Sequence, residues 1–135
     1  MANFYGSCRT NYFTVKDNEA FEEAMSEISG IEVITEGDKY GLLGDDPDGG
    51  TWPGWIWDDE GNETEIDITE IVANHLIDGE VAIFMECGAE KLRYIVGCAV
   101  AVNNKGEVRA IGLQDIYKMA KELTDRPNDI TVAEY

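Results

Sequence analysis

Acidic side chains are the most abundant groups in this sequence that could do chemistry. Aspartate and glutamate total 28 of its 135 residues, against 10 lysines and arginines, so the formal net charge is −18. Two carboxylates at a suitable distance can act as general acid and general base, but acids are so numerous here that no pair stands out. A dense carboxylate surface can also bind a positively charged partner. The position of the acids along the chain therefore matters more than any single pair.

His75 is the only histidine, so a Ser-His-Asp or Cys-His site would have to use it. It stands beside Leu76 and Ile77 in an apolar helical pattern, which is typical of a packed or surface histidine. No serine lies in a Gly-x-Ser-x-Gly setting, and no glycine-rich phosphate-binding loop is present. We therefore expect a protein that is not an enzyme.

The acidic segment 45–50 carries the oxygen ligands that calcium prefers. An EF-hand loop needs glycine at its sixth position. A loop starting at Asp46 has Thr51 there, and a loop starting at Asp59 has Thr64. The three cysteines have no Cys-x-x-Cys spacing for zinc. We expect no cofactor and no dedicated metal site, and a small calcium-binding protein or enzyme is the least favoured alternative.

The negative charge is concentrated in the middle of the chain. Residues 17–90 hold 22 acids and one base, a net charge of −21, whereas residues 1–16 have a net charge of +2 and residues 91–135 a net charge of +1. A small domain needs a net charge of only about 2 to 8 in magnitude to be soluble. Plain solvation remains one interpretation. The other is imitation of DNA, which carries one charge per about 1.7 Å of its axis.

The acids expected to bind a partner fall in three groups, in a first helix, in the loop that follows a hairpin, and in an acidic turn. They would occupy the lysine and arginine groups with which a protein holds phosphates. The residues are Glu19, Glu22, Glu23 and Glu27, then Asp45, Asp46 and Asp48, then Asp58, Asp59 and Glu60.

Three tryptophans within six residues, Trp52, Trp55 and Trp57, lie between the two acidic loops. One interpretation places Trp55 and Trp57 on one face of a strand, in the core. The other makes Trp52 and Trp55 anchors of an interface, because tryptophan is enriched among the residues that dominate binding. An acidic rim around an aromatic centre suits a basic partner through cation–π contacts.

The elements that must position these residues follow from hydrophobic periodicity and turn residues. Hairpin connections dominate, so we predict a single α+β domain over residues 1–135, a mostly antiparallel sheet with about three helices packed on it. The segments 81–87 and 92–102 are strongly apolar and predict buried strands, and 124–135 predicts an irregular tail. Strands are expected at 9–15, 31–36, 39–43, 55–57, 81–87, 92–102 and 107–111, and helices at 18–29, 68–76 and 115–123.

The sequence has no apolar run long enough to span a membrane and no pattern of a signal peptide at its start. An odd number of cysteines argues against a disulfide framework. We therefore expect a cytoplasmic protein that is a monomer or a homodimer and has no membrane partner.

Two segments, 3–13 and 86–94, resemble those of small proteins carried on bacterial mobile elements. Size, together with the acidity of residues 17–90, resembles anti-restriction and anti-CRISPR proteins, several of which are DNA mimics. This second resemblance is one of composition and transfers no functional residues. It implies a non-catalytic inhibitor that blocks the basic DNA-binding surface of a bacterial defence nuclease or CRISPR effector and does not bind nucleic acid itself. The alternative is an immunity protein or antitoxin bound to a basic toxin nuclease, as the small acidic SUKH-type immunity proteins suggest.

Overall fold

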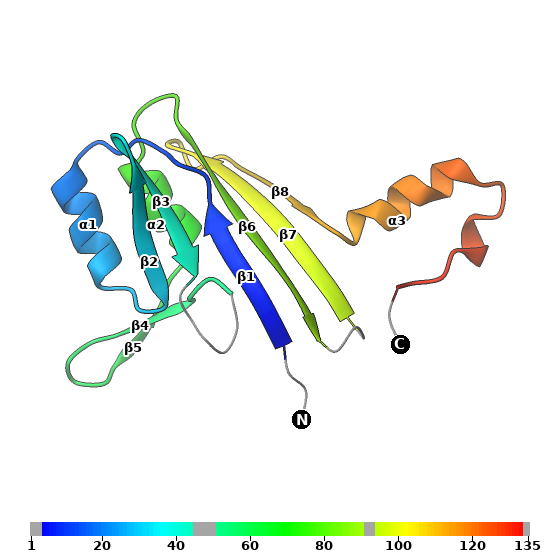
Figure 1. Ribbon diagram of the computed structural model, residues 1–135, viewed down its shortest axis with the longest axis horizontal. Coiled ribbons are helices and arrows are strands. Elements are labelled where there is room, and N and C mark those ends of the chain that lie inside the picture. Colours follow the sequence, from blue (N-terminus) through cyan, green and yellow to red (C-terminus); the bar gives the residue numbers. More distant parts are fainter. Residues whose placement is uncertain (1–3, 45–50, 91–93, 134–135) are drawn as a thin grey trace.

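A six-stranded antiparallel sheet organises the chain in the computed structural model, which describes residues 4–44, 51–90 and 94–133. The strand order is β2-β3-β1-β6-β7-β8, and a separate two-stranded sheet, β4-β5, projects from it (Figure 1). The predicted α+β class with a mostly antiparallel sheet is confirmed. The strands are β1 (Phe4–Thr10), β2 (Ile31–Glu36), β3 (Lys39–Gly44), β4 (Trp55–Trp57), β5 (Glu63–Glu65), β6 (Val81–Glu90), β7 (Tyr94–Asn103) and β8 (Val108–Gly112).

Two helices begin at aspartate caps. The Asp17 carboxylate accepts a hydrogen bond from the Ala20 amide at 3.2 Å and starts α1 (Asn18–Ser26). The Asp67 carboxylate accepts from the Thr69 amide at 3.0 Å and starts α2 (Ile68–His75). Each cap pairs one of the amides that a helix end leaves without an intrahelical partner.

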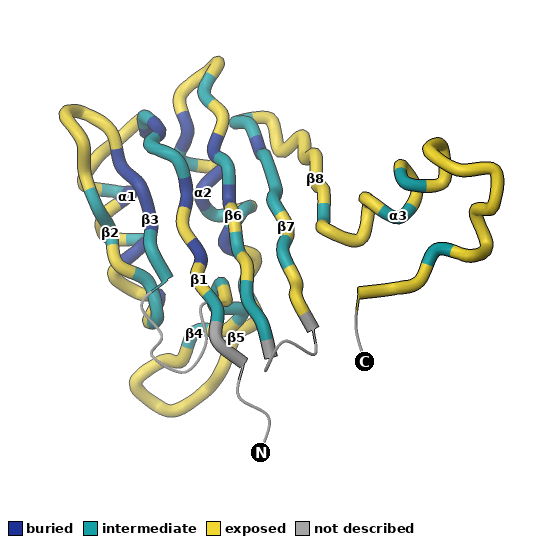
Figure 2. Tube along the Cα trace, turned by 45° about the vertical axis from the view of Figure 1, so that its right-hand side comes forward, coloured by how far each residue is buried: buried dark blue, intermediate teal, exposed yellow. Residues whose placement is uncertain are grey.

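The core lies between these two helices and one face of the sheet. Phe21 and Met25 of α1 and Val72 of α2 are buried against Leu42 and Phe84 of the strands (Figure 2). These apolar residues follow the helical spacing of one stripe and the alternating spacing of one sheet face. The opposite face of the sheet is not covered by α1 or α2, so the sheet has one buried side and one open side.

The strands predicted at 81–87 and 92–102 are confirmed as β6 and β7, but the expectation that they are buried holds for one face only. Phe84 and Val102 point into the core, but Met85 is 55% exposed and Ile95 is 54% exposed on the open side. A continuous apolar run is typical of a strand covered on both faces. Here the run is covered on one face only, so half of its apolar side chains remain accessible.

The first strand begins and ends earlier than the predicted range of 9–15. After Thr10, the side chain of Asn11 takes over the hydrogen bonds to the backbone of β6. Its Oδ1 accepts a hydrogen bond from the Ile83 amide at 2.8 Å, and its Nδ2 donates one to the Val81 carbonyl at 3.1 Å. The chain then crosses the sheet, and Phe13 and Val15 make only isolated bridges.

The third helix does not pack on the sheet, in contrast to the prediction of about three packed helices. α3 (Asp115–Ala120) runs directly into a 3₁₀ turn, η1 (Lys121–Leu123), and neither buries a residue. Beyond it, η2 (Pro127–Asp129) is a further 3₁₀ turn. Figure 1 shows this arm projecting beyond β8, away from α1 and α2. In the described part of the chain, no helix is long and apolar enough to cross a membrane.

Candidate partner-binding surface

The exposed acids of α1, β2 and the β4-β5 hairpin lie at one end of the molecule. These elements occupy the left side of Figure 1, and β8 and α3 occupy the right side. We call this end the acidic end. Its exposed acids whose side chains take part in no hydrogen bond or ion pair among the described residues are Glu19, Glu23, Glu27, Glu32, Glu36, Asp38, Asp59, Glu60, Glu63, Glu65 and, at the start of α2, Glu70.

Ion pairs do not neutralise this charge within the described ranges. The one pair found there joins the exposed side chains of Arg126 and Asp129 at 3.7 Å, at the opposite end of the chain. Lys39, the only base among residues 17–90, lies in β3 and makes no ion pair with the described acids. The carboxylates of the acidic end therefore form no ion pair with any described base.

Several other acids have structural roles instead. Asp17 and Asp67 cap helices, and Glu80 accepts a hydrogen bond from the Thr14 amide at 2.8 Å. Burial raises the pKa of Glu80, but the hydrogen bonds from Thr14, the positive charge of Lys39 and the hydrogen bond from the Val81 amide together outweigh it, and the net pKa is lowered. Asp58 closes the acidic turn, and the hydrogen bond from the Asn62 amide is the main cause of its lowered pKa. Asp58 therefore shapes the hairpin as well as charging it.

Glu22 differs from the other glutamates of α1 because it is bonded to the core. The Tyr40 hydroxyl donates a hydrogen bond to a Glu22 carboxylate oxygen at 2.6 Å. This bond, with burial and the negative charge of Glu22, raises the pKa of Tyr40 to about 12. Of the four α1 glutamates predicted to bind a partner, Glu22 is therefore already engaged, and Glu19, Glu23 and Glu27 are free.

The tryptophan segment divides into one core residue and two exposed residues. Trp52 is half-buried and packs edge-on against Phe84, with ring centroids 5.3 Å apart. Trp55 and Trp57 of β4 are 45% and 58% exposed. The interpretation that put Trp55 and Trp57 in the core is therefore wrong. Among the described residues β4 pairs only with the equally exposed β5, and it is Ile56, between the two tryptophans, that packs against the core.

The structure brings together the acids of α1 and the acids of the hairpin turn at the same end, but it leaves part of the predicted set untested. Asp45, Asp46 and Asp48 lie outside the described residues. Among the residues that are described, no group of three histidine, cysteine or acidic side chains could hold a metal ion. His75 packs edge-on against the Phe21 ring, with centroids 5.8 Å apart.

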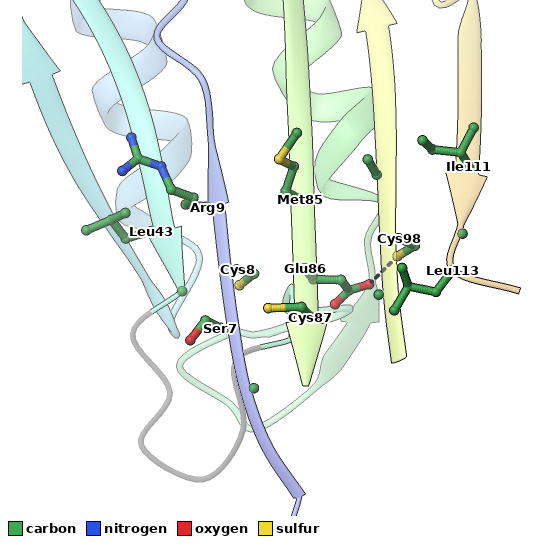
Figure 3. Close-up of a pocket in the computed structure, with 15 residues that line it drawn as sticks. Ser7, Cys8, Arg9, Leu43, Met85, Glu86, Cys87, Cys98, Ile111 and Leu113 are labelled. Atoms are coloured by element: carbon green, nitrogen blue, oxygen red, sulfur yellow. Dashed lines mark hydrogen bonds between the residues drawn. The ribbon is translucent and has the colours of Figure 1, made fainter. Parts of the chain in front are cut away.

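A groove on the open side of the sheet was missed by sequence reasoning. It has a volume of about 660 Å³ and crosses β3, β1, β6, β7 and β8 (Figure 3). Its floor is formed by small residues of adjacent strands, such as Ser7, Cys87 and Gly97, which are register neighbours. Cross-strand register cannot be read from one strand at a time, so only the paired strands reveal this alignment.

Two of the thiols that line this groove, those of Cys8 and Cys98, are poor nucleophiles. Burial raises the pKa of Cys8 to about 11. The Cys98 thiol donates a hydrogen bond to Glu86 at 3.2 Å, and burial followed by this bond raises its pKa. The thiolate is the reactive form of cysteine, so neither group is activated for catalysis.

No family model, curated protein or solved structure matches this chain.

Proposed function

We propose that this protein is a non-catalytic inhibitor that acts in the bacterial cytoplasm by placing its acidic end on a basic, DNA-binding surface of a defence nuclease or CRISPR effector. The observation that carries this proposal is the set of exposed carboxylates on α1, β2 and the β4-β5 hairpin without ion-pair partners among the described residues. Such uncompensated charge repels itself and costs stability. A protein that keeps the charge at one end in spite of that cost gains an electrostatic docking surface.

The spacing of the free α1 glutamates supports imitation of a phosphate row. Glu19, Glu23 and Glu27 follow one another at intervals of four residues, which corresponds to about 6 Å along a helix axis. Two nucleotides of one DNA strand rise about 6.8 Å. Lysine and arginine side chains that hold every second phosphate of one strand would therefore meet carboxylates at a comparable repeat.

The experiment that tests this function uses charge variants of equal size. The triple change Glu19→Gln, Glu23→Gln, Glu27→Gln removes three free carboxylates of the acidic end and spares the Glu22–Tyr40 bond. The control Glu122→Gln, Asp125→Asn, Asp129→Asn removes three exposed carboxylates of the C-terminal arm. Binding is measured against purified DNA-binding enzymes of bacterial defence, a CRISPR surveillance complex and a restriction enzyme, with DNA as competitor.

We expect the α1 triple variant to lose at least about tenfold in affinity, since each contact between close charges contributes around 1.5 kcal/mol or more. The control variant should bind as the unaltered protein does. Equal affinity of both variants for a target would contradict the assignment of α1.

A second candidate function is that of an immunity protein bound to a basic toxin nuclease, and the exposed Trp55 and Trp57 favour it. The two rings lie on one side of β4, and their cross-strand neighbours are the acidic Glu65 and Glu63. If this function holds, Trp55→Ala and Trp57→Ala weaken binding more than the α1 triple variant does. The interface between this protein and the toxin nuclease would then depend on buried aromatic area rather than on charge.

A further inference from the structure

The C-terminal arm presents apolar side chains that nothing in the described chain covers. Ile116 and Met119 of α3 are 57% and 60% exposed, and Leu123 of η1 is 89% exposed. A helix as short as α3 is marginal in water without tertiary packing. Since α3 buries no residue within its own chain, the packing that stabilises it has to come from contact with another molecule.

The open side of the sheet offers an apolar surface of matching character. Met85, Ala99 and Ile111 are register neighbours across β6, β7 and β8 on this side. Leu113 packs over Gly97 next to them. The groove of about 660 Å³ described above and a second groove of about 660 Å³, lined by Ile95 and the α3 side chains, share Ile111 and Leu113. The arm and the sheet therefore form one continuous apolar surface with both projections and hollows.

The accessible area of the whole chain is larger than a compact monomer requires. A compact protein of 15.0 kDa exposes about 7,000 Å², whereas this chain exposes 9442 Å². The difference, roughly 2,400 Å², is spread over the whole chain and is larger than the area of about 800 Å² that each partner buries in a standard interface, so it leaves room for one.

Charge permits a second copy of this chain at this surface more readily than at the acidic end. Two copies meeting through their acidic ends would bring together segments with a net charge of −21 each, but residues 91–135 have a net charge of only +1. A surface that holds both an apolar projection and an apolar hollow is self-complementary, as a twofold interface requires.

We infer that the protein forms a twofold homodimer in which the apolar arm of each copy, Ile116, Met119 and Leu123, packs on the open sheet face of the other. The interface occupies the end of the molecule opposite α1 and β2 (Figure 1). Both acidic ends then point outward, and one dimer presents two of them. This inference does not rest on the proposed function, because it uses none of the acidic-end residues.

The test is the mass of the full chain in solution by sedimentation over a range of concentrations. We expect twice the 15.0 kDa mass of one chain. Ile116→Asp and Met119→Asp should each raise the dimer dissociation constant at least about tenfold, because they place a charge in an apolar contact. The matched control is Trp57→Asp, since Trp57 is 58% exposed and lies in β4, at the acidic end; it should leave the mass unchanged.

Hydrogen exchange of residues 115–120 gives a second readout. In the dimer these amides are protected, and the protection disappears when the protein is diluted below the dissociation constant. A mass of one chain at every concentration overturns the inference, and protection of α3 only in the presence of a defence enzyme would assign the surface to that enzyme instead. A dimer whose mass is indifferent to Ile116→Asp and Met119→Asp equally overturns the role of the arm.

Discussion

At the scale of single residues, structural roles and binding roles are divided among chemically identical side chains. Glu22 and Glu23 are adjacent in α1, yet Glu22 accepts a hydrogen bond from Tyr40 and Glu23 has no side-chain partner among the described residues. The sequence placed both on the outer side of a helix. It could not distinguish them, because the partner of Glu22 comes from a strand 18 residues away.

The Tyr40–Glu22 bond predicts a specific dependence of stability on alkaline pH. The pKa of Tyr40 is raised to about 12 in the folded protein, from an ordinary value of 10.0. The neutral phenol therefore stabilises the fold fully below pH 10, and this stabilisation is lost as the pH rises from 10 to 12. Tyr40→Phe should lower the free energy of unfolding by about 1 to 2 kcal/mol below pH 10.

The measurement is denaturant unfolding at pH values on both sides of 10. The difference between the unaltered protein and Tyr40→Phe should shrink toward pH 12. A Tyr40→Phe difference that is constant with pH would show that the phenol is not held in its neutral form.

The three tryptophans should differ sharply in their effect on stability. Trp52 packs against Phe84, and its indole nitrogen is buried without a hydrogen-bond partner among the described residues. Trp52→Ala should cost about 2 to 4 kcal/mol in the free energy of unfolding, through the cavity it leaves. Trp57→Ala should change it by no more than about 0.5 kcal/mol. Chemical denaturation of the two variants measures both values, and a similar cost for both would mean that the hairpin is packed against the body.

At the scale of elements, local sequence patterns were sufficient to predict where a strand or helix lies when its own residues determine it. The predicted strands at 31–36 and 39–43 and the starts of the helices predicted at 18–29 and 68–76 are all confirmed. The predictions that failed concern relations between elements: which face of β6 and β7 is covered, and whether α3 packs. An amphipathic pattern shows that a face needs a partner but does not identify the partner, so the exposed α3 and the groove could not be predicted.

The cap of α2 can be tested separately from its charge. Asp67→Ala removes the side-chain oxygen that accepts from the Thr69 amide, and it should cost about 1 kcal/mol of the free energy of unfolding. Asp67→Asn removes the same negative charge and keeps a capping oxygen. Asp67→Asn should therefore be more stable than Asp67→Ala, in thermal or denaturant unfolding. Equal stability of the two variants would indicate that charge, rather than the cap, determines the contribution of Asp67.

At the scale of the whole molecule, the uneven charge sets the response to salt. Residues 17–90 carry a net charge of −21, and their mutual repulsion destabilises the fold at low ionic strength. Salt shortens the range of this repulsion to about 10 Å at 0.1 M, so the midpoint of thermal unfolding should rise with salt. The Glu19, Glu23, Glu27 triple variant should melt higher at low salt and show a smaller rise. A midpoint that is independent of salt would mean that the acids do not repel one another appreciably.

The central claim is that the acidic end occupies the place of DNA on a basic protein, and competition binding across a salt series tests it most directly. A CRISPR surveillance complex or a restriction enzyme is titrated with the protein in the presence of labelled DNA, at increasing salt. We predict that the protein displaces DNA and that its affinity falls steeply as salt rises, because the contacts join charges. Simultaneous binding of protein and DNA, or an affinity indifferent to salt, would contradict the claim.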